Sequence, residues 1–305
     1  MNRRNFIKQT GWVLAGGMML RPLNSWTKPR ARQWALLNTN DFHSRFLPFP
    51  ANHKRYPNQG GMARLTSVIQ EYRFKYEHLA LFDCGDVFQG TPYFNVFQGD
   101  PELSWMKKMG YDATTLGNHD FDKGVHHLYT LRKLHQTPTV LCNYEMSGSE
   151  LGDIVTPYKV IKKGPVKIGV TGVCVNLEGL IGKNNRQGLS YIDPIDILQE
   201  NINQLRRKEN CDTVIVLSHL GFEYPDSDKI DDLTLARKTS GVDLILGGHT
   251  HTFLDEPVTL KNKDGRNMVI HQAGWAGLRM GRFVLGYYKR YKAFNYFRIT
   301  FTEQE

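Results

Sequence analysis

The stretch WALLNTNDFH, residues 34–43, shows the pattern from which the fold is predicted. Its first six residues, Trp34–Thr39, are mostly apolar and predict a buried β-strand, and polar residues follow at once from Asn40. Similar apolar runs recur along the chain and alternate with segments such as 61–76, in which apolar residues recur at helical spacing. This alternation predicts an α/β protein with a sheet core and helices outside it.

The other predicted elements continue the same alternation. Strands are expected at 79–83, 113–116, 139–142, 213–218 and 244–247, and helices near 103–109, 125–135 and 194–208. The turn sequence Lys163-Gly164-Pro165 lies between two apolar runs, at 158–161 and 167–173, which predicts a hairpin and a change in sheet topology. Alternating apolar runs from Val258 onward predict antiparallel strands.

Composition favours a folded protein and leaves the kind of partner open. The 305 residues are 40% hydrophobic and 11% aromatic, which is enough for one large core or two modest ones. The net charge of +9 falls to +5 without the four basic residues of the N-terminal segment (39 − 4 = 35 against 30 acids). That excess suits a small anion as readily as nucleic acid, no arginine-rich helix favours nucleic acid, and a solvated basic surface is the alternative. Cys84, Cys142, Cys174 and Cys211 form no cluster, so buried free thiols are expected rather than disulfides or a zinc-cysteine site.

The N-terminal sequence MNRRNFIKQTGWVLAGGMML resembles a twin-arginine export signal. Paired arginines, Arg3 and Arg4, precede an apolar stretch from Trp12 to Leu20, which is shorter than the roughly 20 residues that a membrane span needs. We therefore expect residues 1–30 to be an export signal and linker, and the mature protein to be periplasmic. Retention of the segment as a membrane anchor and an ordinary amphipathic first helix are the alternatives.

Five apolar runs stop where side chains able to bind metal begin. The segments are Asn40-Asp41-Phe42-His43, Asp83-Cys84-Gly85-Asp86, Gly117-Asn118-His119-Asp120, Ser218-His219 and Gly247-Gly248-His249-Thr250-His251. Taken singly, each is explained as a turn or a helix cap. Five such segments at the carboxyl ends of strands, where open α/β sheets bind ligands, indicate one shared site. Carboxylate, imidazole and amide ligands suit zinc, manganese, iron or cobalt, and the lack of cysteine ligands argues against a purely structural zinc site.

These segments together resemble the calcineurin-like metallophosphoesterases, and within them the catalytic domain of the 5′-nucleotidase family. The matching motifs are Asp41-x-His43, Gly85-Asp86-x-x-x-Gly90, Gly117-Asn118-His119-Asp120, His219 and Gly248-His249-x-His251, with Gly90-Thr91-Pro92 and Phe121-Asp122 resembling the nucleotidase form. The resemblance covers roughly residues 33 to 290. It implies a four-layer α/β/β/α sandwich with mixed sheets in a catalytic domain spanning 31–305.

The resemblance also implies a role for each site residue. Two divalent metal ions would be held, one by Asp41, His43 and His251, the other by Asn118, His219 and His249, with Asp86 bridging them. Many nucleotidases have glutamine at the position of His251. His119 would lie over the phosphoryl group as a catalytic residue, and Asp122 would orient it. From the residues alone, Asp122 is also a candidate N-cap for a helix beginning at Lys123.

The expected activity is two-metal hydrolysis of phosphate esters, in which a hydroxide between the metals attacks phosphorus and His119 assists. Phosphomonoesters such as nucleoside 5′-monophosphates are the expected substrates. A cyclic-nucleotide or nucleotide-sugar phosphodiesterase and a non-enzymatic nucleotide-binding relic are the alternatives. In two-domain nucleotidases a C-terminal domain grips the nucleoside. The sequence stops at Glu305 without such a domain, and one hypothesis is that a separate chain supplies it.

Overall fold

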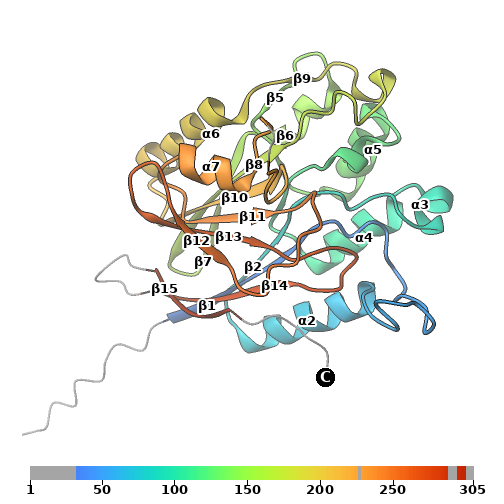
Figure 1. Cartoon of the computed structure of the whole chain (residues 1–305), viewed down its shortest axis with the longest axis horizontal. Helices are drawn as coiled ribbons and strands as arrows, with labels where there is room; N and C mark the ends of the chain where they lie inside the picture. Colours follow the sequence, from blue (N-terminus) through green and yellow to red (C-terminus); the bar gives the residue numbers. More distant parts are fainter. Residues whose placement is uncertain (1–31, 226–227, 288–293, 300–305) are drawn as a thin grey trace, which may run out of the picture. The chain divides into compact units, whose positions relative to one another are not determined.

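Two mixed β-sheets form the centre of the structure, a computed structural model that describes residues 32–225, 228–287 and 294–299 (Figure 1). From edge to edge, the first sheet contains β15 (Phe294–Ile299), β14 (Gly281–Tyr287), β1 (Arg32–Thr39), β2 (Leu79–Asp83), β3 (Ala113–Thr114), β4 (Thr139–Val140) and β6 (Val155–Thr156). The second contains β12 (Val258–Lys261), β13 (Asn267–Gln272), β11 (Leu244–Gly247), β10 (Thr213–His219), β8 (Val166–Cys174) and β7 (Tyr158–Lys163). The predicted export signal lies outside the described residues.

Helices cover the outer faces of both sheets. The first sheet packs against α2 (Met62–Lys75), α4 (Asp100–Met109) and α5 (Val125–His135), and the second against α6 (Pro194–Asn203) and α7 (Asp232–Lys238). A π-helical turn at Gln204–Lys208 extends α6, so the helical segment ends where the sequence predicts. No helix within the described ranges is long and apolar enough to cross a membrane.

The period-two alternation of side chains explains the layers. Trp34 and Leu36 on β1 join the apolar cluster between the two sheets, whereas Ala35 and Leu37 join the cluster beneath the helices. Because successive side chains on a strand point to opposite faces, a strand buried on both faces must be apolar throughout. The predicted four-layer α/β/β/α sandwich with mixed sheets is therefore confirmed.

Several local predictions are also confirmed. Asp193 caps α6, since its carboxylate accepts a hydrogen bond of 3.0 Å from the backbone N–H of Ile195, and Pro194 occupies the first turn. Strands β7 and β8 form the expected antiparallel hairpin. Cys84, Cys142, Cys174 and Cys211 are buried free thiols.

The prediction of antiparallel strands after Val258 is wrong for part of that region. Strand β13 pairs antiparallel with β12 but parallel with β11, and β14 leaves the second sheet to pair with β1 in the first. An apolar pattern shows that a strand is buried but not which neighbour it chooses.

The predicted strands at 113–116 and 139–142 are shorter in the structure, at two residues each. After β3 the chain turns away so that Gly117 can approach Asp86. Helix α3 (Pro92–Phe97) and the small sheet of β5 (Tyr144–Glu145) and β9 (Ser190–Tyr191) were not predicted.

Candidate metal centre

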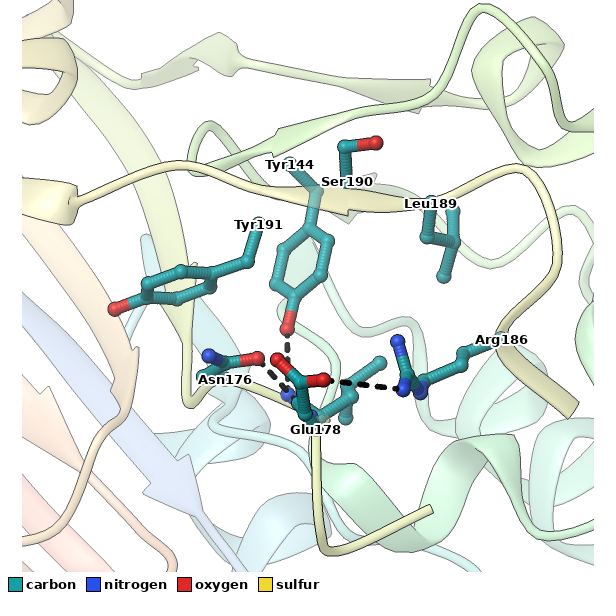
Figure 2. Close-up of a pocket in the computed structure, with 8 residues that line it drawn as sticks. Tyr144, Asn176, Glu178, Arg186, Leu189, Ser190 and Tyr191 are labelled. Carbon is teal, nitrogen blue, oxygen red and sulfur yellow. Dashed lines mark hydrogen bonds and ion pairs between the residues drawn. The ribbon is translucent and has the colours of Figure 1, made fainter. Parts of the chain in front are cut away.

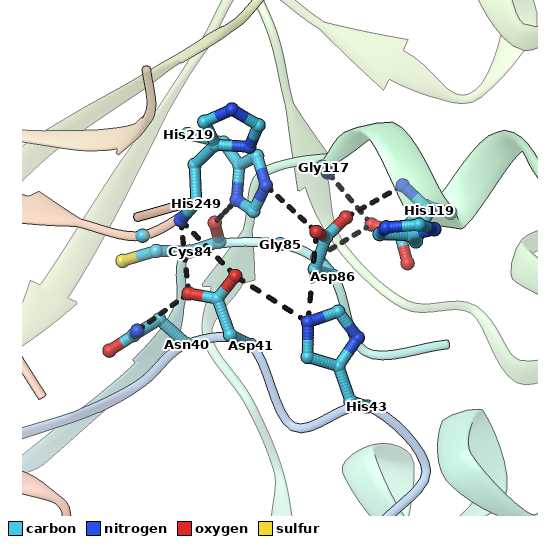
Figure 3. Close-up of polar contacts among 12 residues, drawn as sticks. Asn40, Asp41, His43, Cys84, Gly85, Asp86, Gly117, His119, His219 and His249 are labelled. Carbon is cyan, nitrogen blue, oxygen red and sulfur yellow. Dashed lines mark hydrogen bonds and ion pairs between the residues drawn. The ribbon is translucent and has the colours of Figure 1, made fainter. Parts of the chain in front are cut away.

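All seven predicted metal ligands lie at the carboxyl ends of strands in both sheets. Asp41 and His43 follow β1, Asp86 follows β2, Asn118 follows β3, His219 ends β10, and His249 and His251 follow β11. Strands β1, β2 and β3 run parallel, as do β10 and β11, so the loops of each sheet emerge at one edge. Figure 3 shows the carboxylates of Asp41 and Asp86 among the imidazole rings contributed by both sheets.

The first group of possible ligands is Asp41, His43 and His251, which offer ligand atoms within 4.8 Å of one another. Nε2 of His251 lies 3.3 Å from Oδ1 of Asp41 and 3.0 Å from Nε2 of His43. Nδ1 of His43 lies 3.1 Å from the carbonyl oxygen of Phe88, to which it donates. That bond places the proton on Nδ1 and leaves the Nε2 lone pair for a cation.

The second group is Asp86, His219 and His249. Nδ1 of His219 donates to the carbonyl oxygen of Cys84 at 2.7 Å, which fixes the same tautomer, and Nε2 faces Oδ2 of Asp86 at 3.1 Å. The same Asp86 oxygen lies 3.9 Å from Nε2 of His43 in the first group. Asp86 therefore stands between the two groups, in the position that a bridging ligand needs.

Three buried atoms at this centre have no hydrogen-bond partner in the described part of the chain, and one of them, Nε2 of His219, faces the carboxylate of Asp86. The other two are Oδ1 of Asn118 and Nδ1 of His249. A buried polar atom without a partner costs about 1–3 kcal/mol, and metal coordination would remove that cost. Because both atoms are neutral donors of an electron pair, the residues present fit a divalent cation.

The electrostatics of the metal-free centre also favour a cation. Burial lowers the pKa of His219, but the carboxylates of Asp86 and Asp41 outweigh burial and raise that pKa to about 10. The pKa of Asp86 is lowered against the effect of burial, because His219 and His43 lie beside it. Burial lowers the pKa of His249 to about 4, which keeps this imidazole neutral and able to coordinate.

Five of the seven candidate ligands adopt the left-handed backbone conformation that side chains usually avoid. Their φ angles are 49° for Asp41, 51° for His43, 56° for Asp86, 74° for His249 and 53° for His251. Such strain costs about 1–3 kcal/mol per residue and concentrates at functional sites. The surrounding fold therefore holds these side chains in place at an energetic cost.

Asp120 fixes the backbone of the ligand loops by hydrogen bonds, and its place in the Gly-Asn-His-Asp motif did not reveal this role. Its carboxylate accepts hydrogen bonds from the backbone N–H groups of Asp86 and Val87, both at 3.2 Å, and of Gly117 at 2.9 Å. The buried guanidinium of Arg132, on α5, lies 3.8 Å from it. One carboxylate thus joins the loops after β2 and β3.

Three further supporting residues were missed from the sequence. Nδ2 of Asn40 donates to Oδ2 of Asp41 at 2.7 Å, and Nε2 of Gln272 donates to the carbonyl oxygen of Gly248 at 2.6 Å. The indole of Trp275 stacks on the imidazole of His251, with ring centroids 5.3 Å apart and planes 6° from parallel. No local pattern marks these roles, because Gln272 and Trp275 lie more than twenty residues from the groups they hold.

His119 and Asp122 lie beside the candidate metal centre as a hydrogen-bonded pair. Nδ1 of His119 lies 3.0 Å from Oδ2 of Asp122, and its ring centroid is 5.5 Å from that of His43. The bond to Asp122 raises the pKa of His119, against burial. The alternative role for Asp122 as a helix N-cap is wrong, because α5 begins at Val125 after Gly124.

Comparisons with known proteins agree with this geometry. A family model described as calcineurin-like phosphoesterase matches residues 36–253. The snake venom 5′-nucleotidase of Gloydius brevicauda is 34% identical over 266 residues, covering 81% of this chain and 44% of that protein. The 5′-nucleotidase of Bos taurus is 33% identical over 276 residues, covering 83% and 46%.

A solved structure gives the same result. That of a 5′-nucleotidase precursor from Thermus thermophilus is 28% identical with a TM-score of 0.77, covering 88% of this chain and 54% of that one. The chain spans less than half the length of the two curated relatives.

Proposed function

Because the chain belongs to the calcineurin-like phosphoesterase family, we propose that it hydrolyses phosphomonoesters with two divalent metal ions and that nucleoside 5′-monophosphates are its substrates. The observation that carries this proposal is the placement of one Asp86 oxygen between two ligand groups, 3.1 Å from His219 and 3.9 Å from His43. Relatives named as 5′-nucleotidases support the choice of substrate.

Each candidate ligand has a defined task in this proposal. Asp41, His43 and His251 would hold one ion, Asn118, His219 and His249 the other, and Asp86 both. Two such ions supply Lewis-acid catalysis, which activates water as a nucleophile and neutralises the charge of the phosphoryl group. Carboxylate, imidazole and amide donors suit zinc, manganese, iron or cobalt.

His119 and Asp122 complete the proposed chemistry. Since Nδ1 of His119 is engaged with Asp122, Nε2 is the atom left to face a substrate. The raised pKa of His119 increases the share of imidazolium, which can donate a proton to the departing ester oxygen. Its side chain is 36% exposed, so a substrate can reach it.

The proposal is tested by comparing the rates on p-nitrophenyl phosphate, bis(p-nitrophenyl) phosphate and AMP. We expect the monoesters to react faster than the diester. Asn118→Ala should reduce the monoester rates by about a hundredfold or more, because it removes a proposed metal ligand. Asn95→Ala, at an exposed position of α3, is the matched control and should leave the rates unchanged.

Two outcomes would redirect this proposal. Faster reaction of the diester would favour the cyclic-nucleotide or nucleotide-sugar phosphodiesterase alternative. Absence of phosphate release from every ester by the metal-loaded protein would favour a nucleotide-binding relic.

We also propose that residues 1–30 direct twin-arginine export to the periplasm. The paired arginines before a short apolar stretch support this. Replacing Arg3 and Arg4 with lysine should retain the protein in the cytoplasm, and the mass of the exported wild-type protein distinguishes a cleaved form from an anchored one. A periplasmic double variant would refute the proposal.

The separate chain that would supply a nucleotidase C-terminal domain stays a prediction, checked by co-purification from the native source.

A further inference from the structure

A pocket of about 450 Å³ opens beside the candidate metal centre, and His249 forms part of its wall. Two tyrosines, Tyr191 and Tyr224, and the carboxylates of Glu178 and Asp228 also line it. Since His249 is a candidate ligand, the pocket begins where a phosphoryl group would be held. No candidate metal ligand other than His249 lines this pocket among the described residues.

Figure 2 shows a second pocket, of about 320 Å³, which shares lining residues with the first. The two share Asn176, Glu178 and Tyr191, and the second extends to Arg186. We name the two pockets together the side groove. Nη2 of Arg186 lies 3.8 Å from Oε1 of Glu178, so the two side chains form an ion pair within the groove.

One wall of the side groove, the segment 175–191, is anchored at both of its ends. The hydroxyl of Tyr144 donates to the carbonyl oxygen of Val175 at 2.6 Å and accepts from the N–H of Leu177 at 3.0 Å. Strand β9 pairs with β5 at the other end. The segment is therefore a preformed wall of the groove.

The same wall also contacts the proposed catalytic pair. Nδ2 of Asn185 donates to the carbonyl oxygen of Asp122 at 2.8 Å. The wall thus extends from the ligand His249 to the residue that orients His119. A phosphate ester held at the centre by His249 and its neighbours would have this groove beside it, as a place for its alcohol leaving group.

The residues that line the groove determine which alcohol leaving groups it can bind. The ring of Tyr191 is partly buried and offers an aromatic face for stacking, whereas Nζ of Lys229 lies over the ring of Tyr224, 5.4 Å from its centroid. The amide of Asn176 and the carboxylate of Glu178 can hydrogen-bond hydroxyl groups. Arg186 pairs with Glu178, and around the pocket next to His249 two further acidic side chains, Asp193 and Asp228, stand against one lysine, Lys229. A second anionic group would be repelled there.

We propose that the side groove binds the leaving group of the substrate and selects a nucleoside, an uncharged ring system with hydroxyl groups, over a leaving group that carries a phosphate. This inference rests on the proposed phosphomonoesterase function and deepens it. It assigns nucleoside recognition to the metallophosphoesterase domain itself, through Tyr191 and its neighbours.

Nucleoside binding is tested without catalysis, by titrating adenosine or ribose into the metal-free protein in a calorimeter. Adenosine should bind more tightly than ribose, and Tyr191→Leu should weaken adenosine binding about tenfold, since it removes a stacking face. Tyr129→Leu on α5, which lines neither pocket, is the matched control. Equal adenosine affinity in wild type and Tyr191→Leu, or equal binding of ribose and adenosine, would overturn the inference.

The selection against charge is tested by kcat/KM for AMP and ADP. Attack at the terminal phosphorus of ADP makes AMP, an anion, the leaving group, so AMP should be the better substrate. Glu178→Gln with Asp228→Asn should reduce the AMP-to-ADP ratio about fivefold, whereas Glu71→Gln with Asp264→Asn, both exposed and elsewhere, should not. A ratio that both pairs leave unchanged would overturn the charge selection.

The failures of the two proposals are distinguishable. Asn118→Ala should lose phosphate release but retain adenosine binding, because Asn118 does not line the groove. If the wild-type protein releases phosphate but binds adenosine no better than the Tyr191 variant, the groove inference fails alone. If adenosine binds through Tyr191 but no ester is hydrolysed, the proposed function fails alone.

Discussion

Replacing Arg132 with methionine tests how the fold supports the candidate metal centre. Arg132 is 1% exposed, and its Nη1 donates to the hydroxyls of Thr114 at 2.8 Å and Thr139 at 3.0 Å. Its Nη2 lies 3.8 Å from the buried carboxylate of Asp120. Arg132→Met preserves much of the apolar stem but removes the only guanidinium that faces Asp120 in the described residues.

The expected loss follows from the charge left behind. A buried ion pair that loses one partner typically costs about 3–5 kcal/mol, because the remaining charge is buried without compensation. That is a large share of the roughly 5–15 kcal/mol by which folded domains are stable. Because the Asp120 carboxylate joins the loops that carry Asp86 and Asn118, the variant should also bind metal about tenfold more weakly.

Urea denaturation followed by circular dichroism measures the first effect, and metal analysis after dialysis measures the second. Lys133→Met, at the next and exposed position of α5, is the control and should change the free energy of unfolding by less than about 0.5 kcal/mol. Asp120→Asn and Arg132→Met together should cost less stability than the sum of the two single changes, because each removes the same buried charge pair. The reasoning is refuted if Arg132→Met unfolds at the wild-type urea concentration, or if the two substitutions are additive.

Three further predictions follow from the same structure. Trp275→Leu removes the indole stacked on a candidate ligand ring, and should weaken binding of one of two metal ions about tenfold while Trp275→Phe retains it, as metal titration will show. Gly117→Ala would place a methyl group inside contact distance of the Asp86 carboxylate and should abolish phosphate release, whereas Gly182→Ala, with open space around it, should not. Burial raises the pKa of Asp83 from 3.8 to about 7, so the folded protein retains a proton that the unfolded chain loses. The free energy of unfolding of the wild type should therefore fall relative to that of Asp83→Asn as pH rises from 3.8 towards 7, by at most about 1.4 kcal/mol per pH unit. If urea denaturation gives the same pH dependence of unfolding free energy for both proteins, the prediction is wrong.

The sequence predicted best where a local pattern and a local cause coincide. The bounds of β2, β11 and α5 agree with the expected segments 79–83, 244–247 and 125–135, because each element is a single apolar or amphipathic run with clear ends. The candidate ligands were identifiable for a similar reason, since each follows a strand within a few residues. Within each sheet their convergence follows from the parallel direction of the strands, whereas the meeting of the two sets depends on how the two sheets pack.

What the sequence did not reveal depends on contacts between distant parts of the chain. Arg132 lies in the helix expected at 125–135, and the helical pattern did not indicate that its side chain is buried beside Asp120. Trp275 and Gln272 hold ligand loops from strands or turns that only the pairing of β13 with β11 brings near. Which strand neighbours which is decided by packing of both sheet faces at once, and no single window of sequence contains that information.

The candidate metal ligands are divided between the two sheets, so bound cations would connect the sheets. The first group takes Asp41 and His43 from the first sheet and His251 from the second, and the second group takes Asp86 from the first sheet and His219 and His249 from the second. Each cation would therefore join the two sheets at the edge where their loops meet. Because metal binding to such a site also opposes unfolding, the binding free energy of the cations would add to the stability of the sandwich. That contribution would offset the strain of the five left-handed ligand positions, which the surrounding fold already holds at a single centre.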